Sequence, residues 1–166
     1  MENKNSIGTN VLCHVAILVK DIRRAVDNWA AILGVEKPNI WNLPDAKTVP
    51  SFTRGESGDY TDCQLAVFDL ENAKIELCQP GQNPSPWKEA LDKYGEGVQH
   101  VSFVVPDRDQ ANRALEGIGV PPAYHIGYWP TTTYAFFDSK DQLGVEINIK
   151  TDEDNTEKIA SLIKNL

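Results

Sequence analysis

Apolar and polar residues alternate in two stretches of the chain that begin alike and lie about half a chain apart. The stretch HVAILVKD covers residues 14–21, and HVSFVVPD covers residues 100–107. Strict alternation predicts a half-buried β-strand in each stretch, because successive side chains of a strand point to opposite faces. The repetition indicates that one structural unit is used twice.

A helical pattern follows each of these strands. Asp21 and Asp107 are predicted to cap the helix N-termini, and Gly34 and Gly119 to end the helices. The apolar positions at helical spacing are Ile22, Val26, Trp29, Ala30 and Leu33 in the first helix and Ala111, Ala114, Leu115 and Ile118 in the second. Each half of the chain therefore contains one strand and one amphipathic helix in the same order.

Apolar runs of strand length complete each half. They cover residues 63–70, 73–80, 133–139 and 144–150. The stretch WNLPDAKTVPSFTRGESGDY, which precedes the first of these runs, has no regular pattern. We therefore predict an α+β fold in which two βαβββ modules form one cupped, mixed sheet.

The same patterns predict the domain boundaries. Residues 10–150 form the domain, with module one at 10–82, a linker with a short helix at 83–96 and module two at 97–150. Residues 1–9 are expected to be a flexible N-terminus. Residues 151–166 are expected to form a helix that docks on the domain through Ile159, Leu162, Ile163 and Leu166.

The last strand of each module carries a glutamate, Glu76 in KIELCQ and Glu146 in GVEINI. Strand alternation places these glutamates on one face of the sheet with His14 and His100, while the opposite face is apolar. A single strand histidine is more often a buried core residue, and a single glutamate is usually a solvated edge residue. The doubled pattern favours a mixed nitrogen and oxygen site for a divalent ion such as Co²⁺, Ni²⁺, Zn²⁺, Mn²⁺ or Fe²⁺.

Composition and charge narrow the classes of partner. The 166 residues are 41% hydrophobic, enough for one ordinary core. The formal charge of −8 argues against nucleic acid and anionic membranes, which need a basic face, and no apolar run approaches the ~20 residues of a membrane helix. The cysteines, Cys13, Cys63 and Cys78, have no metal-binding or disulfide spacing, which favours a reducing cytoplasm.

Four segments resemble, in order and spacing, the signature blocks of methylmalonyl-CoA epimerase-like proteins in the vicinal oxygen chelate superfamily. They are HVAILVKDI, NAKIELCQPGQNPSPWKEAL, GVQHVSFVV and FFDSKDQLGVEINI. The resemblance covers residues 10–150 and implies a divalent metal held by His14, Glu76, His100 and Glu146. It also implies a metal that takes a substrate carbonyl oxygen while a carboxylate removes the adjacent proton.

This chemistry predicts an isomerase, a racemase or epimerase that inverts a stereocentre next to the carbonyl of a small molecule through an enolate. Glu76 and Glu146 are the expected proton-transfer groups, one from each module. We also expect a homodimer. Three alternatives are methylmalonyl-CoA epimerase itself, a glyoxalase-I-like lyase and a non-enzymatic small-molecule binding protein.

Departures from the epimerase-like pattern bear on the substrate. Gln64 stands where some members carry a further glutamate, and HIGYWPTTTYAFF (125–137) stands where a small, glycine-rich loop is usual. The predicted substrate-binding residues are Gln64, Tyr128, Trp129, Trp41 and Tyr60, with Phe52 nearby. Such an aromatic cleft favours a ring-bearing ketone such as dihydrodaidzein over an acyl-CoA, unless the aromatic residues are loop anchors or dimer contacts. His125 is expected at the surface or the substrate rim.

Overall fold

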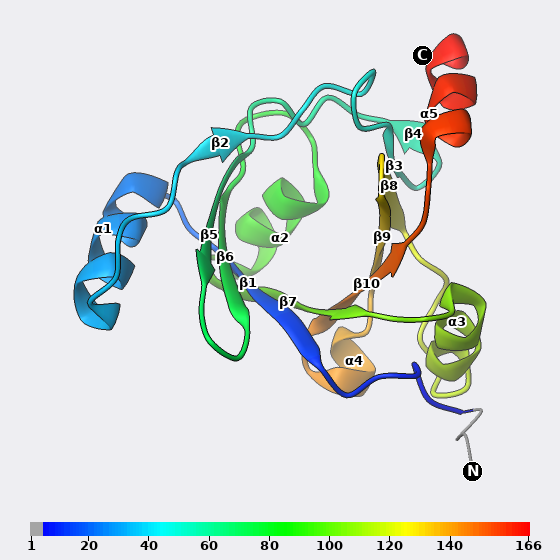
Figure 1. The fold of residues 1–166 in the computed structure, drawn as a ribbon, viewed down its shortest axis with the longest axis horizontal. Helices are drawn as coiled ribbons and strands as arrows, with labels where there is room; N and C mark the ends of the chain where they lie inside the picture. Colours follow the sequence, from blue (N-terminus) through cyan, green and yellow to red (C-terminus); the bar gives the residue numbers. More distant parts are fainter. Residues whose placement is uncertain (1–4) are drawn as a thin grey trace.

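The repeated pattern folds into two halves of one curled sheet, described for residues 5–166 by a computed structural model (Figure 1). The first half contains β1 (Leu12–Leu18), α1 (Ile22–Leu33), β2 (Trp41–Asn42), β5 (Gln64–Asp69) and β6 (Lys74–Gln79). The second half contains β7 (Gly97–Val104), α3 (Arg108–Glu116), β8 (His125–Trp129), β9 (Thr132–Phe137), α4 (Lys140–Leu143) and β10 (Glu146–Asp152). The remaining elements are β3 (Ser51–Thr53), β4 (Glu56–Ser57), α2 (Pro86–Tyr94), α5 (Thr156–Leu162) and a 3-10 turn (Ile163–Asn165).

The sheet has the strand order β2-β5-β6-β1-β7-β10-β9-β8-β3-β4. In each half the first strand pairs in parallel with the last, β1 with β6 and β7 with β10. The antiparallel pair of β1 and β7 joins the halves at the centre. The prediction of two βαβββ modules in one mixed sheet is confirmed, and both modules belong to one chain.

The hairpin of β3 and β4 departs from a simple two-module division. It lies in the stretch that had no regular pattern, yet β3 pairs with β8 of the second half, where Phe52 is in register with Ile126. The turn of the hairpin uses Arg54 and Gly55, both with positive φ, as a tight two-residue β-turn requires. The first module thus supplies the outer edge of the second.

Both predicted helix N-caps are confirmed. The side chain of Asp21 accepts a hydrogen bond from the Arg24 N–H, and Asp107 accepts one from the Gln110 N–H, each at 3.0 Å. Gly34 ends α1 in the left-handed conformation. The prediction that α3 continues to Gly119 was wrong, because α3 ends at Glu116 and the next three residues form a turn.

The apolar residues form cores on both sides of the sheet. On the convex side, α1 packs on the first half and α3 on the second through most of the predicted apolar positions, but Leu33 and Ile118 were wrongly predicted to pack and are exposed. On the concave side, α2 covers one end of the cup, and its Trp87 contacts residues of both halves. The cup is therefore closed at one end and open at the other.

The C-terminal prediction was half right. A helix forms in α5, near β3 and β4 (Figure 1), where Lys158 lies over the Tyr128 ring and Ile159 and Leu162 are half-buried, although no residue of the helix is fully buried. Ile163 and Leu166 are exposed, so only part of the predicted apolar stripe is covered. Asn155, just before α5, is buried and donates a hydrogen bond to the Trp129 carbonyl oxygen, which holds the start of the helix against the domain.

The predicted flexible N-terminus lies partly outside the described residues. Within the described part, Ile7 packs against the core under α3, and the Ser6 carbonyl oxygen accepts a hydrogen bond from Gln110. None of the helices within residues 5–166 combines the length and the hydropathy needed to cross a bilayer.

Candidate metal centre

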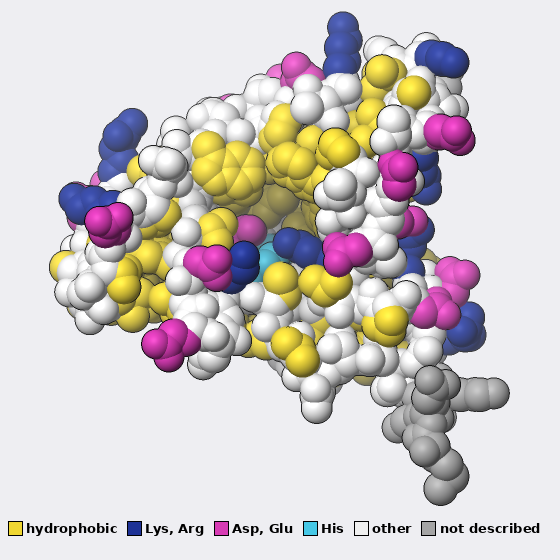
Figure 2. Space-filling model, in the orientation of Figure 1, with side chains coloured by type: hydrophobic (Ala, Val, Ile, Leu, Met, Phe, Trp, Pro, Cys, Tyr) yellow, Lys and Arg dark blue, Asp and Glu magenta, His cyan; other side chains and the backbone are white. Residues whose placement is uncertain are grey.

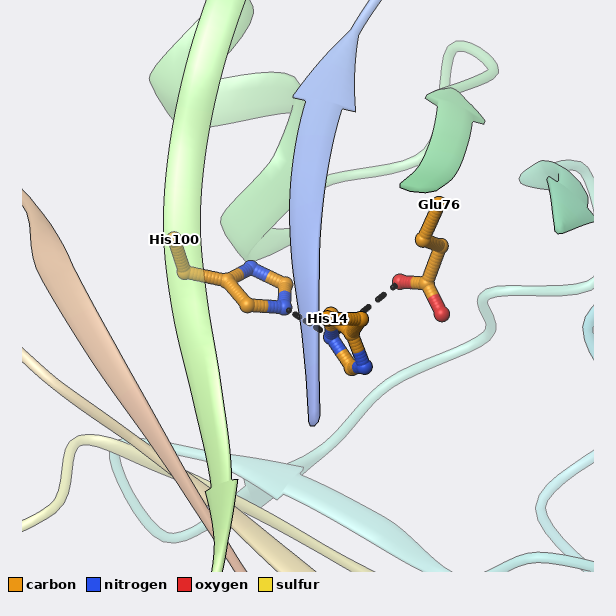
Figure 3. Close-up of side chains that lie close together, drawn as sticks. All are labelled: His14, Glu76 and His100. Carbon is orange, nitrogen blue, oxygen red and sulfur yellow. Dashed lines mark hydrogen bonds and ion pairs between the residues drawn. The ribbon is translucent and has the colours of Figure 1, made fainter. Parts of the chain in front are cut away.

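Three of the four predicted ligands come together on the concave face. His14 from β1, Glu76 from β6 and His100 from β7 point toward one another in Figure 3. The two Nε2 atoms lie 3.0 Å apart, and His14 Nε2 lies 4.0 Å from Glu76 Oε1. One ligand atom from each of the three residues falls within 4.8 Å of the others.

Strand register explains this convergence. The strand β1 lies between β6 and β7, and Ala16 is in register with both Glu76 and His100. Residues in register share a face, and His14 lies two residues before Ala16 on that face. A repeat that places one histidine near the start of each module therefore brings both histidines to the central pair of strands.

Burial keeps both imidazoles neutral. Desolvation, with the nearby charges of Lys150 and Lys74, lowers the pKa of His14 to about 3. Desolvation likewise lowers the pKa of His100 well below its ordinary value. The 4.0 Å approach of His14 to Glu76 is therefore not an ion pair at neutral pH.

The donor set fits a divalent ion. The Nδ1 atom of His100 lies 3.3 Å from Gln99 Oε1, which favours a proton on Nδ1 and leaves the Nε2 lone pair free for a metal. Burial raises the pKa of Glu76, and the charge of Lys150 opposes that rise. Two neutral nitrogen donors and one carboxylate are the ligand types of many Zn²⁺, Co²⁺ and Fe²⁺ sites.

Glu146 lies beside this group but does not join it. The residue is in register with His100 on the adjacent strand, so it shares the face. Its Oε2 atom accepts a hydrogen bond of 2.7 Å from the Tyr124 hydroxyl, and burial raises its pKa. Glu146 would have to leave Tyr124 to become a fourth ligand, so that role stays a prediction.

The three side chains open into a cavity of about 430 Å³. Its apolar wall includes Trp41, Leu43, Leu65, Trp87, Trp129 and Phe136. Its polar lining includes His14, Glu76, His100, Asn148, Lys150 and Asp152. Figure 2 shows the hollow with hydrophobic side chains along one rim and a histidine on its floor. Such a mixture is typical of a small-molecule site.

The predicted substrate-binding residues divide into two groups. Trp41 and Trp129 line the cavity, and their rings meet edge to face with centroids 6.3 Å apart. Tyr128 and Tyr60 lie outside the lining: the first is buried under Lys158 of α5, and the second packs against Trp87 and His125.

Gln64 also lies outside the cavity lining. Its neighbour Leu65 lines the cavity instead. The register of β5 with β6 pairs Val67 with Glu76, which places Leu65 on the metal face and Gln64 on the other. The cavity wall therefore has the aliphatic side chain of Leu65 where the sequence predicted a polar contact from Gln64.

The prediction for His125 was wrong. Its side chain is 1% exposed and stacks on Phe136 with ring centroids 5.0 Å apart. Its Nδ1 lies 2.9 Å from Thr53 Oγ1 and its Nε2 lies 3.1 Å from the Tyr134 hydroxyl. The residue is part of a strand, β8, that the sequence pattern did not reveal, and it packs in the core between the halves.

Two further polar residues line the cavity: Asn148, which strand alternation had placed on the concave face with Glu146, and Lys150, which sequence reasoning missed. Both follow Glu146 at intervals of two along β10, so strand alternation puts them on the same face. Asn148 is fixed by hydrogen bonds with Ser102 and the Ala135 carbonyl oxygen. Extending the alternation by one more step would have found Lys150.

Acid is expected to destabilise the fold through His125. Burial lowers its folded-state pKa from 6.5 to about 3, so between these values the unfolded chain binds the proton and the folded chain does not. The free energy of unfolding should therefore fall as pH falls from about 6.5, by up to about 1.4 kcal/mol per pH unit for this residue. Urea denaturation at a series of pH values measures the slope.

The matched variant is His125→Asn, which keeps a hydrogen-bonding side chain but has no imidazole to protonate. Its stability should fall less steeply with acid than that of the unchanged protein. His14 and His100, with lowered pKa values, and Glu76 and Glu146, with raised ones, contribute alike to both proteins, so the difference between the two slopes reports His125. If the free energy of unfolding fell equally steeply with pH in both proteins, the assignment of this acid sensitivity to His125 would be contradicted.

Comparison with known proteins agrees with this geometry. A family model described as "Glyoxalase/Bleomycin resistance protein/Dioxygenase superfamily" matches residues 13–136. No curated protein matches the chain.

Solved structures of similar fold include two methylmalonyl-CoA epimerases. The enzyme from Mycobacterium tuberculosis is 23% identical, with a TM-score of 0.57 and 94% of each chain covered. A Streptomyces coelicolor epimerase variant in complex with 2-nitronate-propionyl-CoA is 20% identical, with a TM-score of 0.56 and 85% of this chain and 93% of that chain covered. A hypothetical protein from Bacillus halodurans C-125 is 19% identical, with a TM-score of 0.59, covering 86% and 94% respectively.

Proposed function

The chain belongs to the glyoxalase/bleomycin resistance protein/dioxygenase superfamily, and from that premise we propose that it is a metal-assisted racemase or epimerase. It would invert a stereocentre next to a carbonyl group through an enolate. The observation that carries this proposal is the group of His14, Glu76 and His100, which faces a cavity with an aromatic wall.

The reaction requires help at the carbonyl oxygen, because a proton next to a ketone or thioester is too weakly acidic for a carboxylate alone. A divalent ion held by His14, Glu76 and His100 would supply Lewis-acid stabilisation of the negative charge that develops on that oxygen. A substrate seated against the apolar wall would displace water from the same region, which would strengthen electrostatic interactions there.

Proton transfer is the task of the chain's own carboxylates. Glu76 lines the cavity, and burial raises its pKa while it holds no metal; as a ligand it would have to free one carboxylate oxygen to accept the proton. Glu146 has a raised pKa as well, but it is held by Tyr124 and lies outside the cavity lining. Glu76 is therefore the better placed of the two, and Glu146 is the proposed second group, for the opposite face of the substrate.

The aromatic wall supports a ring-bearing ketone over an acyl-CoA. Trp41, Trp87 and Trp129 offer flat surfaces for a ring. Dihydrodaidzein, the substrate of dihydrodaidzein racemase, has such a ring system. Methylmalonyl-CoA epimerase activity is the second candidate, favoured by the shared fold of the M. tuberculosis enzyme.

Solvent-deuterium exchange tests the proposal. The protein, loaded in turn with Co²⁺, Zn²⁺, Mn²⁺ or Fe²⁺, is incubated in heavy water with single enantiomers of dihydrodaidzein and methylmalonyl-CoA. We expect deuterium to enter at the stereocentre of dihydrodaidzein as its optical activity decays. Exchange with methylmalonyl-CoA alone would show that the substrate is an acyl-CoA. Exchange with neither compound would favour a lyase or a binding protein.

Two matched variants assign the base. Glu76→Gln keeps an oxygen donor in the same place but cannot accept the proton, so exchange should fall by about a hundredfold when the two proteins are compared at equal metal content. Glu146→Gln should slow loss of optical activity more than exchange, since one face of the substrate would keep its base. An unchanged rate in Glu76→Gln would remove Glu76 from the mechanism.

A further inference from the structure

Lys150 brings a positive charge into the cavity beside the metal group. Its ammonium lies 3.5 Å from Nδ1 of His14, on the side of the ring away from His100. The side chain is half-buried and lines the cavity. Figure 2 shows Lys or Arg side chains next to the histidine on the floor of the hollow.

The Glu76 carboxylate is near enough to feel this charge but forms no ion pair with it. Lys150 is absent from the ion pairs formed within residues 5–166. Lys74, which also acts on His14, is exposed and pairs with Asp69 at 3.5 Å. Besides Glu76, the cavity lining contains the acidic residue Asp152, at the end of β10. Asp152 is exposed and accepts a hydrogen bond from Thr132.

An ammonium beside an apolar wall loses part of its hydration, and the long 3.5 Å contact with the neutral His14 ring replaces little of it. An anionic oxygen bound there would form a charge-assisted hydrogen bond in a partly desolvated setting, where such bonds are strong. A divalent ion at His14, Glu76 and His100 would add positive charge to the same region and increase the preference for an anion.

We propose that Lys150 is a specificity-determining residue that binds an anionic oxygen of the substrate, a carboxylate or an ionised phenol. The substrate then has three recognised parts: a carbonyl at the metal group, a ring against Trp41 and Trp129, and an anion at Lys150. The role of the carbonyl in this inference rests on the proposed function. Binding of the anion does not, because Lys150 lines the cavity whether or not the chain is an isomerase.

Calorimetric titration of the chelator-treated protein tests the inference without a metal or a turnover assay. The probes are 2-naphthoate and its neutral counterpart 2-naphthamide, with 4-nitrophenol at a pH where it is ionised as the phenol arm. We expect 2-naphthoate to bind about tenfold more tightly than 2-naphthamide, as a charge-assisted hydrogen bond implies. Lys150→Met should abolish that preference, and Lys150→Arg should restore much of it.

The control is Lys20→Met, which removes an exposed lysine outside the cavity and should leave the preference unchanged. Equal affinities of the unchanged protein for 2-naphthoate and 2-naphthamide would overturn the inference, as would a preference that survives in Lys150→Met or no binding of either probe. Loss of 4-nitrophenol binding in Lys150→Met extends the site to phenols, and its persistence restricts the site to carboxylates. If the titration shows no anion preference but deuterium exchange is observed, the anion site is contradicted and the proposed function is not. If the preference is found without exchange, the proposed function is contradicted and the anion site is not.

Discussion

Replacement of His100 by alanine is expected to lower the affinity for Co²⁺ or Zn²⁺ by more than about a thousandfold. The substitution removes one of two nitrogen donors that lie 3.0 Å apart. Loss of a residue that merely orients a ligand typically costs 10- to 100-fold, so loss of a ligand itself should cost more. Metal content after dialysis, together with titration of the Co²⁺ absorption band, measures the effect.

Two other variants sharpen this test. His125→Asn changes the remaining histidine, which lies in the core and outside the metal group, and should keep full metal content. Glu146→Gln asks whether a fourth ligand is recruited: an unchanged affinity would place Glu146 outside the coordination sphere, and a large loss would place it inside. If folded His100→Ala retained the metal, the assignment of His100 as a ligand would be contradicted, and with it the proposed metal centre.

Replacement of Phe136 by alanine is expected to lower the free energy of unfolding by about 3–5 kcal/mol, the usual cost of removing a buried aromatic ring. The ring is 2% exposed and lies within 4.8–5.6 Å, centroid to centroid, of His100, His125 and Trp87. It thus joins β7 and β8 to α2. Equilibrium unfolding in urea measures the loss.

A matched control is Ile32→Ala on α1, where the side chain is 74% exposed. Its effect should stay within about 0.5 kcal/mol, as for most surface substitutions. A similar change in the two variants would mean that the ring cluster around Phe136 contributes little to stability.

The repeated pattern allowed much of the fold to be predicted, because the relevant signals are local. An aspartate cap, a 3.6-residue period and a left-handed glycine define α1 within a short window. Alternation along β1, β6 and β7 was sufficient to place His14, Glu76 and His100 on one face. Their mutual approach then follows from strand order, which the repeat itself implied.

What could not be predicted depends on contacts between distant segments. The strand β8 is recognisable only through its pairing with β9 and β3, and without it His125 resembled a loop residue. Gln64 and Leu65 differ in role by one residue of register, and register is set by pairing with β6. The hydrogen bond of Glu146 to Tyr124 likewise joins residues that no local pattern connects.

The pairing of β3 with β8 also sets an order of events during synthesis. Residues 51–57 leave the ribosome before their partner strand, residues 125–129, has been made. Synthesis of the intervening segment, about 70 residues, takes on the order of several seconds. During that interval Leu43, Tyr60 and Leu65 lack Tyr134 and Phe136, with which they form one core. The nascent first half therefore exposes apolar side chains that favour aggregation until the second half has been made.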